Sequence, residues 1–95
     1  MSNDLHAIQI QILPILKAAG VRRAAIFGST VRGEATDESD VDILIDSPDG
    51  TSLLDFIALE HQLADALGRR VDLVEYRAIK PLLRDRILKE QVPIL

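Results

Sequence analysis

The segment DVDILID (residues 40–46) places two aspartates in a run that otherwise has the pattern of a buried β-strand. Aspartate is depleted in strands and is almost never fully buried unless it is paired or holds a metal. Because side chains alternate along a strand, Asp40 and Asp42 are predicted to point to one face, with Cα atoms ~6.7 Å apart. The apolar residues of the segment then point the other way, into the core: Val41, Ile43 and Ile45.

The spacing of these carboxylates predicts a metal site. Two carboxylates ~7 Å apart can both bind hard cations held ~4 Å apart, which is the arrangement of two-metal phosphoryl transfer. Oxygen-only ligands favour magnesium or manganese over zinc. Asp72 lies in a similar apolar segment, RVDLVEY (residues 70–76). If the two segments are neighbouring strands, Asp72 completes a cluster of three carboxylates; the alternative is a single acid that protects an edge strand.

The turn FGST (residues 27–30) precedes the aspartates and predicts a phosphate site. Gly28 lets the backbone approach a ligand closely, and Ser29 opens a helical turn whose free N–H groups can bind phosphate. Arg32, one turn later, can bind the same triphosphate or can be a solvated surface residue. Phosphate-binding groups beside metal-binding carboxylates predict a site for a nucleoside triphosphate.

The rest of the pattern predicts a single α+β domain over residues 1–95. Apolar residues at helical spacing predict helices near residues 5–19, 52–67 and 81–90, and Pro14 is expected to kink the first helix or to begin a second short one. Strands are predicted over residues 21–27, 40–46 and 70–76. The loop between the first two is too short for a helical crossover, so these strands should be antiparallel. The expected architecture is a mixed three- to four-stranded sheet flanked by helices.

Composition narrows the classes of function. The chain of 95 residues has no cysteine, which excludes a disulfide, a thiolate metal site and a cysteine nucleophile. A net charge of −4 argues against extended binding of nucleic acid. With no basic N-terminal region before an apolar run and no run long enough for a membrane span, we expect a cytoplasmic protein without membrane contact.

The combined motif resembles a known family. Gly28-Ser29, then ten residues, then Asp40-Val41-Asp42 is similar to the glycine-serine and paired-aspartate motif of the polymerase-beta-like nucleotidyltransferase superfamily. The longer string FGSTVRGEATDESDVDILI resembles the minimal nucleotidyltransferase (MNT) proteins of bacteria and archaea. The resemblance implies the polymerase-beta-like fold, two divalent ions on Asp40 and Asp42, and the triphosphate on Gly28 and Ser29. It also implies that Asp72 is the third carboxylate, associated with activating the acceptor hydroxyl.

The resemblance also implies a reaction and a partner. We expect an enzyme that transfers AMP from ATP to a hydroxyl, with two magnesium ions (or manganese) as cofactors. The chain is too short for a separate acceptor domain, so another chain is expected to supply the acceptor. For MNT proteins this partner is a HEPN-domain ribonuclease toxin, modified on a tyrosine, and the transferase is its antitoxin. The alternatives are a non-catalytic antitoxin that occludes its toxin, and nucleotidylation of a small molecule such as an aminoglycoside. The apolar stripe of residues 81–95 fits either core or a docking surface for a partner.

Overall fold

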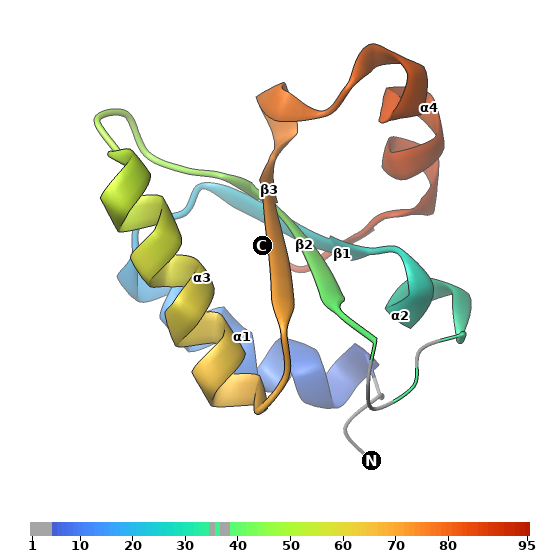
Figure 1. Ribbon diagram of the computed structural model, residues 1–95, viewed down its shortest axis with the longest axis horizontal. Helices are drawn as coiled ribbons and strands as arrows, with labels where there is room; N and C mark the ends of the chain where they lie inside the picture. Colours follow the sequence, from blue (N-terminus) through green and yellow to red (C-terminus); the bar gives the residue numbers. More distant parts are fainter. Residues whose placement is uncertain (1–4, 35, 37–38) are drawn as a thin grey trace.

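The computed structural model describes residues 5–34, 36 and 39–95 as a four-stranded sheet with helices on both faces (Figure 1). The elements follow one another as α1 (Leu5–Ala18), β1 (Arg23–Phe27), α2 (Ser29–Arg32), β2 (Val41–Asp46), α3 (Leu53–Leu67), β3 (Val71–Glu75), the 3₁₀ turn η1 (Tyr76–Ala78), α4 (Pro81–Glu90) and β4 (Val92–Pro93). The predicted mixed sheet and its flanking helices are confirmed.

The strands lie in the order β3-β2-β1-β4. β1 and β2 are antiparallel, as the short connection predicted, and Phe27 lies opposite Asp42. β2 and β3 are parallel, with α3 as the crossover between them, and Asp42 lies opposite Asp72. The short strand β4, which the sequence did not predict, pairs antiparallel with Ala25 and Ile26 of β1.

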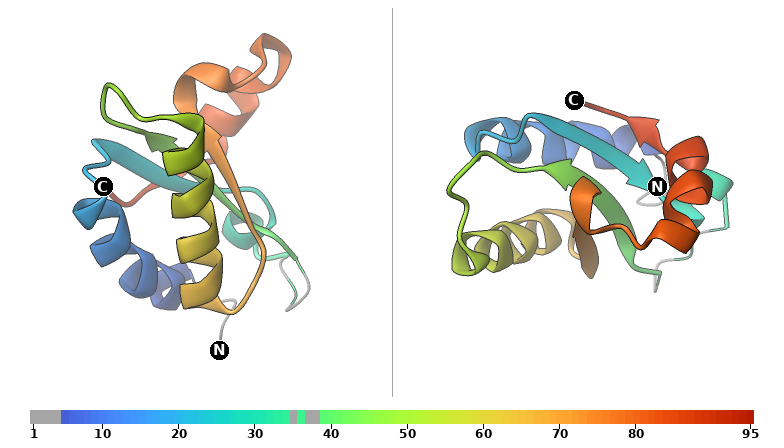
Figure 2. Two further views of the ribbon diagram at one scale, coloured as in Figure 1. Left: turned by 60° about the vertical axis from the view of Figure 1, so that its left-hand side comes forward. Right: turned by 90° about the horizontal axis from the view of Figure 1, so that it is seen from above.

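The sheet has a core on each face. α1 and α3 pack on one face, against side chains of all three long strands, including Ile26, Ile43 and Leu73. Val41, Ile43 and Ile45 are fully buried there, as the alternation predicted. α4 and η1 pack on the other face, over Ala25 and Leu44. Figure 1 and the two views of Figure 2 show α4 on the opposite side of the strands from α1 and α3.

α1 corrects one expectation about Pro14. It is one continuous α-helix from Leu5 to Ala18, with Pro14 inside it, so the prediction of a second short helix is wrong. Ile8, Ile12 and Leu16 form a fully buried stripe four residues apart, whereas Pro14 lies on the exposed side. Packing of this stripe on the sheet therefore outweighs the single hydrogen bond that proline cannot donate.

α3 begins and ends at residues with the expected capping chemistry. The Ser52 side chain accepts from Asp55 N–H, and the Asp55 side chain accepts from Ser52 N–H, which is a complete capping box. Gly68 ends the helix in the left-handed conformation, with φ of 65°.

No helix in the described part of the chain is both long and apolar enough to cross a membrane.

Candidate functional site

The register of the strands brings the predicted aspartates together. Asp42 and Asp72 are the second residues of two parallel neighbouring strands and lie directly opposite each other. Their side chains point to the face that α4 covers, because they alternate with core residues of the opposite face. Asp40 lies one residue before β2 and is exposed, so the predicted strand began one residue too early. The end of β1 and the following Gly28 lie at the same corner.

Gly28 is required where the turn passes Asp42. A Cβ atom on Gly28 would lie 2.0 Å from Asp42 Oδ2, which is far inside van der Waals contact. Its φ of 76° also lies in the left-handed region that favours glycine. The sequence predicted that Gly28 allows a close approach to its backbone, and in the structure the group that approaches is the carboxylate of Asp42.

The carboxylates at this corner repel one another. Burial, the largest cause, and the negative charges of Asp72 and Asp40 together raise the pKa of Asp42 to about 6, while Arg32 opposes the shift. Partial burial likewise raises the pKa of Asp72, with Glu60 and Asp40 as further causes. Both shifts mean that the charged forms are disfavoured in the folded protein. A divalent cation at this corner would relieve the repulsion.

The donor chemistry fits a hard cation, because all three predicted ligands are carboxylates. Asp40 Oδ1 forms a salt bridge with Arg70 Nε at 3.0 Å, and the charge of Asp40 also raises the pKa of Asp42 and of Asp72. Within residues 5–34, 36 and 39–95, no three acidic or histidine side chains converge as a ready-made site for one metal ion. The residues that could hold metal are Asp42, Asp72 and Asp40, and Asp40 would exchange its salt bridge with Arg70 for the ion.

The predicted phosphate-binding turn lies beside Asp42, and a carboxylate already contacts Gly28 and Arg32. α2 is the expected single turn, starting at Ser29. The Gly28 N–H donates to Glu90 Oε1 at 3.0 Å, and Arg32 NH1 donates to the same oxygen at 2.7 Å. Arg32 Nε also donates to Glu34 at 2.8 Å. These contacts raise the pKa of Arg32, with Glu34 as the larger cause.

Glu90 is a residue of this corner that sequence reasoning did not single out. It is the last residue of α4, and its side chain is 18% exposed. The signal that could have identified it is electrostatic: the negative end of the helix dipole disfavours an acid in the last turn. An acid at that position needs a cationic or N–H partner elsewhere, and here it has both.

A groove opens beside Asp72 on the face that α4 covers. Its volume is about 360 Å³. Apart from Asp72 and Lys80, the residues that line it are apolar: Phe27, Val74, Ala78, Ile79, Leu83 and Ile87. An aromatic or aliphatic group bound there would lie next to the third carboxylate.

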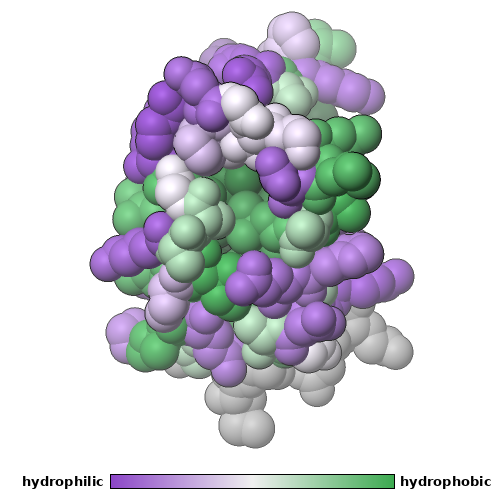
Figure 3. All heavy atoms as spheres, turned by 90° about the vertical axis from the view of Figure 1, so that its left-hand side faces the viewer, coloured by the Kyte–Doolittle hydropathy of each residue, from purple (hydrophilic) through white to green (hydrophobic). Residues whose placement is uncertain are grey.

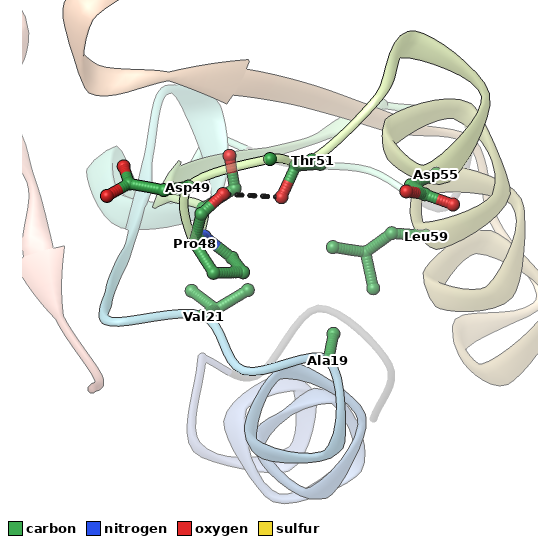
Figure 4. A pocket seen from close by; sticks show the side chains of 9 residues that line it. Ala19, Val21, Pro48, Asp49, Thr51, Asp55 and Leu59 are labelled. Carbon is green, nitrogen blue, oxygen red and sulfur yellow. Dashed lines mark hydrogen bonds between the residues drawn. The ribbon is translucent and has the colours of Figure 1, made fainter.

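A second cavity, of about 390 Å³, lies at the opposite end of β2 (Figure 4). Val21, Pro48 and Leu59 form its apolar wall, and Asp49 and Asp55 are the charged groups among the residues that line it. The Thr51 hydroxyl donates to the Pro48 carbonyl at 2.7 Å and closes the loop above it. It includes none of the six predicted site residues, so we place the candidate site at the Asp42 corner.

Several large apolar side chains reach the surface. Leu53 and Leu54 at the start of α3 are 73% and 78% exposed, and Leu82 at the start of α4 is 97% exposed. Figure 3 shows apolar side chains on the surface of the α3 side, among hydrophilic ones. A shallower groove between Leu53, Phe56 and Ala78 continues this apolar surface towards η1. Exposed apolar surface of this kind is common where proteins bind one another.

The comparisons with known proteins identify the family of the chain. A family model described as a nucleotidyltransferase domain matches residues 10–94. The chain belongs to this nucleotidyltransferase family. It is 47% identical over 92 residues to a Methanocaldococcus jannaschii protein assigned as a protein adenylyltransferase, covering 97% of this chain and 99% of that one. It is 51% identical over 73 residues to the protein adenylyltransferase MntA of Thermococcus cleftensis, covering 77% and 74% of the two chains.

Solved structures give the same assignment. A protein assigned as a minimal nucleotidyltransferase superposes with a TM-score of 0.81 at 39% identity, over 94% of this chain and 91% of that one. A toxin–antitoxin structure with AMP-PNP superposes with a TM-score of 0.80 at 25% identity, over 92% and 72%. The predicted resemblance to the MNT proteins and to the polymerase-beta-like fold is confirmed, and the chain is a nucleotidyltransferase.

Proposed function

We propose that this nucleotidyltransferase moves AMP from ATP onto a tyrosine hydroxyl of a HEPN-domain ribonuclease toxin and acts as the antitoxin of that toxin. The observation that carries the chemistry is the pairing of Asp42 with Asp72 across β2 and β3, next to the Gly28 turn. The similarity to a protein adenylyltransferase from Thermococcus cleftensis and to a toxin–antitoxin structure containing AMP-PNP supports the choice of nucleotide and of a protein acceptor.

In this proposal, Asp40 and Asp42 hold two magnesium ions, or manganese, and Asp72 is the third carboxylate. When bound, such ions neutralise charge on the triphosphate and lower the pKa of the acceptor hydroxyl. The Gly28 and Ser29 backbone and the Arg32 guanidinium bind the terminal phosphates, because N–H groups and a guanidinium are the donors that phosphate prefers. Gly28 also keeps Asp42 in place, since any larger residue would displace its carboxylate.

The strand order supports an assignment of the sides from which the acceptor enters and pyrophosphate leaves. The phosphate-binding turn follows β1, the paired carboxylates are on β2, and Asp72 is on β3. An in-line reaction therefore brings the acceptor oxygen from the β3 side and releases pyrophosphate on the β1 side. The acceptor oxygen forms a bond to the α-phosphorus as the bond from that phosphorus to the bridging oxygen breaks. Asp72, whose pKa is raised, accepts the hydroxyl proton.

The apolar groove beside Asp72 supports an aromatic acceptor. A groove lined by Phe27, Val74 and Leu83 suits the ring of a tyrosine, with its hydroxyl directed at Asp72. A cationic aminoglycoside would instead need an acidic pocket, and Lys80 lies at this groove. The exposed leucines of α3 and α4 provide apolar surface on which a protein partner could dock.

The test is incubation of the protein with α-labelled ATP and magnesium, with and without a co-expressed HEPN-domain partner, followed by intact-mass analysis. We expect label on the partner, in steps of one AMP unit, at a tyrosine identified by digestion. The double variant Asp40→Asn/Asp42→Asn should transfer no label, whereas Asp49→Asn, a change at a side chain that is 95% exposed, should transfer it normally.

The same variants separate the alternatives in a toxin neutralisation assay. Loss of neutralisation in Asp40→Asn/Asp42→Asn supports the catalytic antitoxin. Neutralisation that survives in this double variant would instead establish an antitoxin that occludes its toxin. Label that appears only on added small molecules, and never on protein, would overturn the choice of acceptor while leaving the nucleotidyltransferase chemistry in place.

A further inference from the structure

Glu90 occupies the anion position of the Gly28 turn. One oxygen, Oε1, accepts both from the Gly28 N–H at 3.0 Å and from Arg32 NH1 at 2.7 Å. The carboxylate is 18% exposed and lies close enough to Asp42 to contribute to the rise of its pKa. An N–H group and a guanidinium sharing one anionic oxygen is the arrangement by which proteins bind a phosphate oxygen.

The backbone of Glu90 is tied to the sheet on both sides. The Gln91 N–H donates to the Ile87 carbonyl at 2.9 Å and closes the end of α4. Val92 and Pro93 follow at once as β4, paired with β1. Since the backbone is held at these points, the Glu90 carboxylate can leave the Gly28 turn by rotation of its side chain, without movement of α4.

We propose that Glu90 determines the specificity of the site for polyphosphates by competing with them for Gly28 and Arg32. This inference rests on the proposed function in one respect, the binding of the nucleotide phosphates at the Gly28 turn. The Gly28 N–H is a single donor, so a phosphate oxygen bound to it displaces the Glu90 oxygen. A phosphate oxygen that stays near Arg32 while Glu90 remains also meets its negative charge.

Displacement selects ligands by the number of acceptor oxygens they offer. An incoming anion must replace two charge-assisted hydrogen bonds, and a triphosphate offers more acceptor oxygens than a monophosphate. The same competition acts after the reaction, because Glu90 can return to Gly28 and Arg32 and promote release of pyrophosphate. Glu90 is thus a specificity-determining residue for the binding of polyphosphates and the release of pyrophosphate.

The test measures binding of magnesium pyrophosphate and of magnesium ATP by isothermal titration calorimetry, without any acceptor protein. Glu90→Ala is expected to bind both about tenfold more tightly than the unmodified protein, and AMP to gain measurable affinity. Glu90→Gln keeps an acceptor for the Gly28 N–H but removes the charge, so it should show a smaller gain of the same sign. It also serves as the informative variant if Glu90→Ala does not fold.

The matched control is Glu34→Gln. Glu34 pairs with the same guanidinium at 2.8 Å and is 63% exposed, but it bonds to Arg32 and leaves the Gly28 N–H to Glu90. Its affinities should stay within about twofold of the unmodified protein. Weaker binding in the Glu90 variants would show that Glu90 holds the turn in a phosphate-binding conformation, and it would overturn the proposed competition. Unchanged binding would overturn the proposed competition as well.

These outcomes are independent of the transfer assay. Tighter binding in the Glu90 variants, with no label transfer to any protein, would contradict the proposed acceptor and still support competition by Glu90. Absence of pyrophosphate and ATP binding in the unmodified protein and in every variant would overturn both the inference and the proposed function.

Discussion

Asparagine at position 42 is expected to stabilise the metal-free protein while removing its metal site. The carboxylate of Asp42 lies against Gly28, half-buried, opposite Asp72, and its pKa is raised from 3.8 to about 6. The folded protein therefore binds a proton at Asp42 more tightly than the unfolded chain does. Asp42→Asn keeps the shape of the side chain and removes the charge, so it removes this penalty.

The magnitude follows from linkage. Between pH ~4 and pH ~6 the Asp42 carboxyl is ionised in the unfolded chain but largely protonated in the folded protein. The free energy of unfolding therefore falls as pH rises across this window. The whole shift corresponds to about 3 kcal/mol. Because the carboxylate is only half-buried, solvent screens part of the penalty, and we expect about 1–2 kcal/mol. For a domain of this size that is about 5–10 °C in melting temperature.

The assay is thermal unfolding followed by circular dichroism from pH 4 to pH 8. In the presence of a chelator, Asp42→Asn should melt higher than the unmodified protein at pH 8 and nearly the same at pH 4. Magnesium should raise the melting temperature of the unmodified protein and leave that of the variant unchanged. Asp49→Asn, on a side chain that is 95% exposed, should match the unmodified protein throughout.

One result would refute this reasoning. If Asp42→Asn melts lower than the unmodified protein at pH 8 without metal, the ionised carboxylate is stabilised by its surroundings rather than strained by them. A difference that does not shrink towards pH 4 would also show that charge is not its cause.

Two further predictions concern stability, each measured by urea unfolding. Gly33→Ala should cost about 1–2 kcal/mol, because φ is 73° and, among the described residues other than its chain neighbours, none lies within 4 Å of the new Cβ. Gly28→Ala should cost clearly more, since its Cβ also displaces Asp42. Equal costs would contradict the close approach. Ser47→Ala should cost about 1–3 kcal/mol, because the hydroxyl donates to the poorly exposed Glu75 carboxylate at 2.9 Å. A loss below 0.5 kcal/mol would show that water replaces that donor.

The pairing of β1 with β2 could be predicted because local rules determine it. Alternation fixed which face Asp42 uses, and the length of the connection fixed the direction of β2 relative to β1. For Asp72 only a conditional prediction was possible, a place beside Asp42 if the two strands are neighbours, and the register shows that they are. These rules act within one strand or across one loop, which is the range over which a single sequence is informative.

The parts that were not predicted depend on contacts between distant segments. β4 has two residues, too few for any periodicity, and is defined by its pairing with Ala25 and Ile26 of β1. The continuity of α1 through Pro14 depends on packing against the sheet. The contact between Gly28 and Glu90 joins residues 62 positions apart, and no local pattern encodes it.

The candidate site therefore has two parts that favour ions of opposite charge. The protein's own side chains partly neutralise each of them. Asp42 and Asp72 repel each other and favour a cation, while Asp40 is paired with Arg70. Gly28 and Arg32 favour an anion, and Glu90 supplies one. A cation alone leaves Glu90 in the anion position, and a triphosphate alone adds negative charge beside Asp42. Because only the two together satisfy both parts, magnesium and ATP should bind with positive cooperativity, each raising the affinity for the other by the same factor.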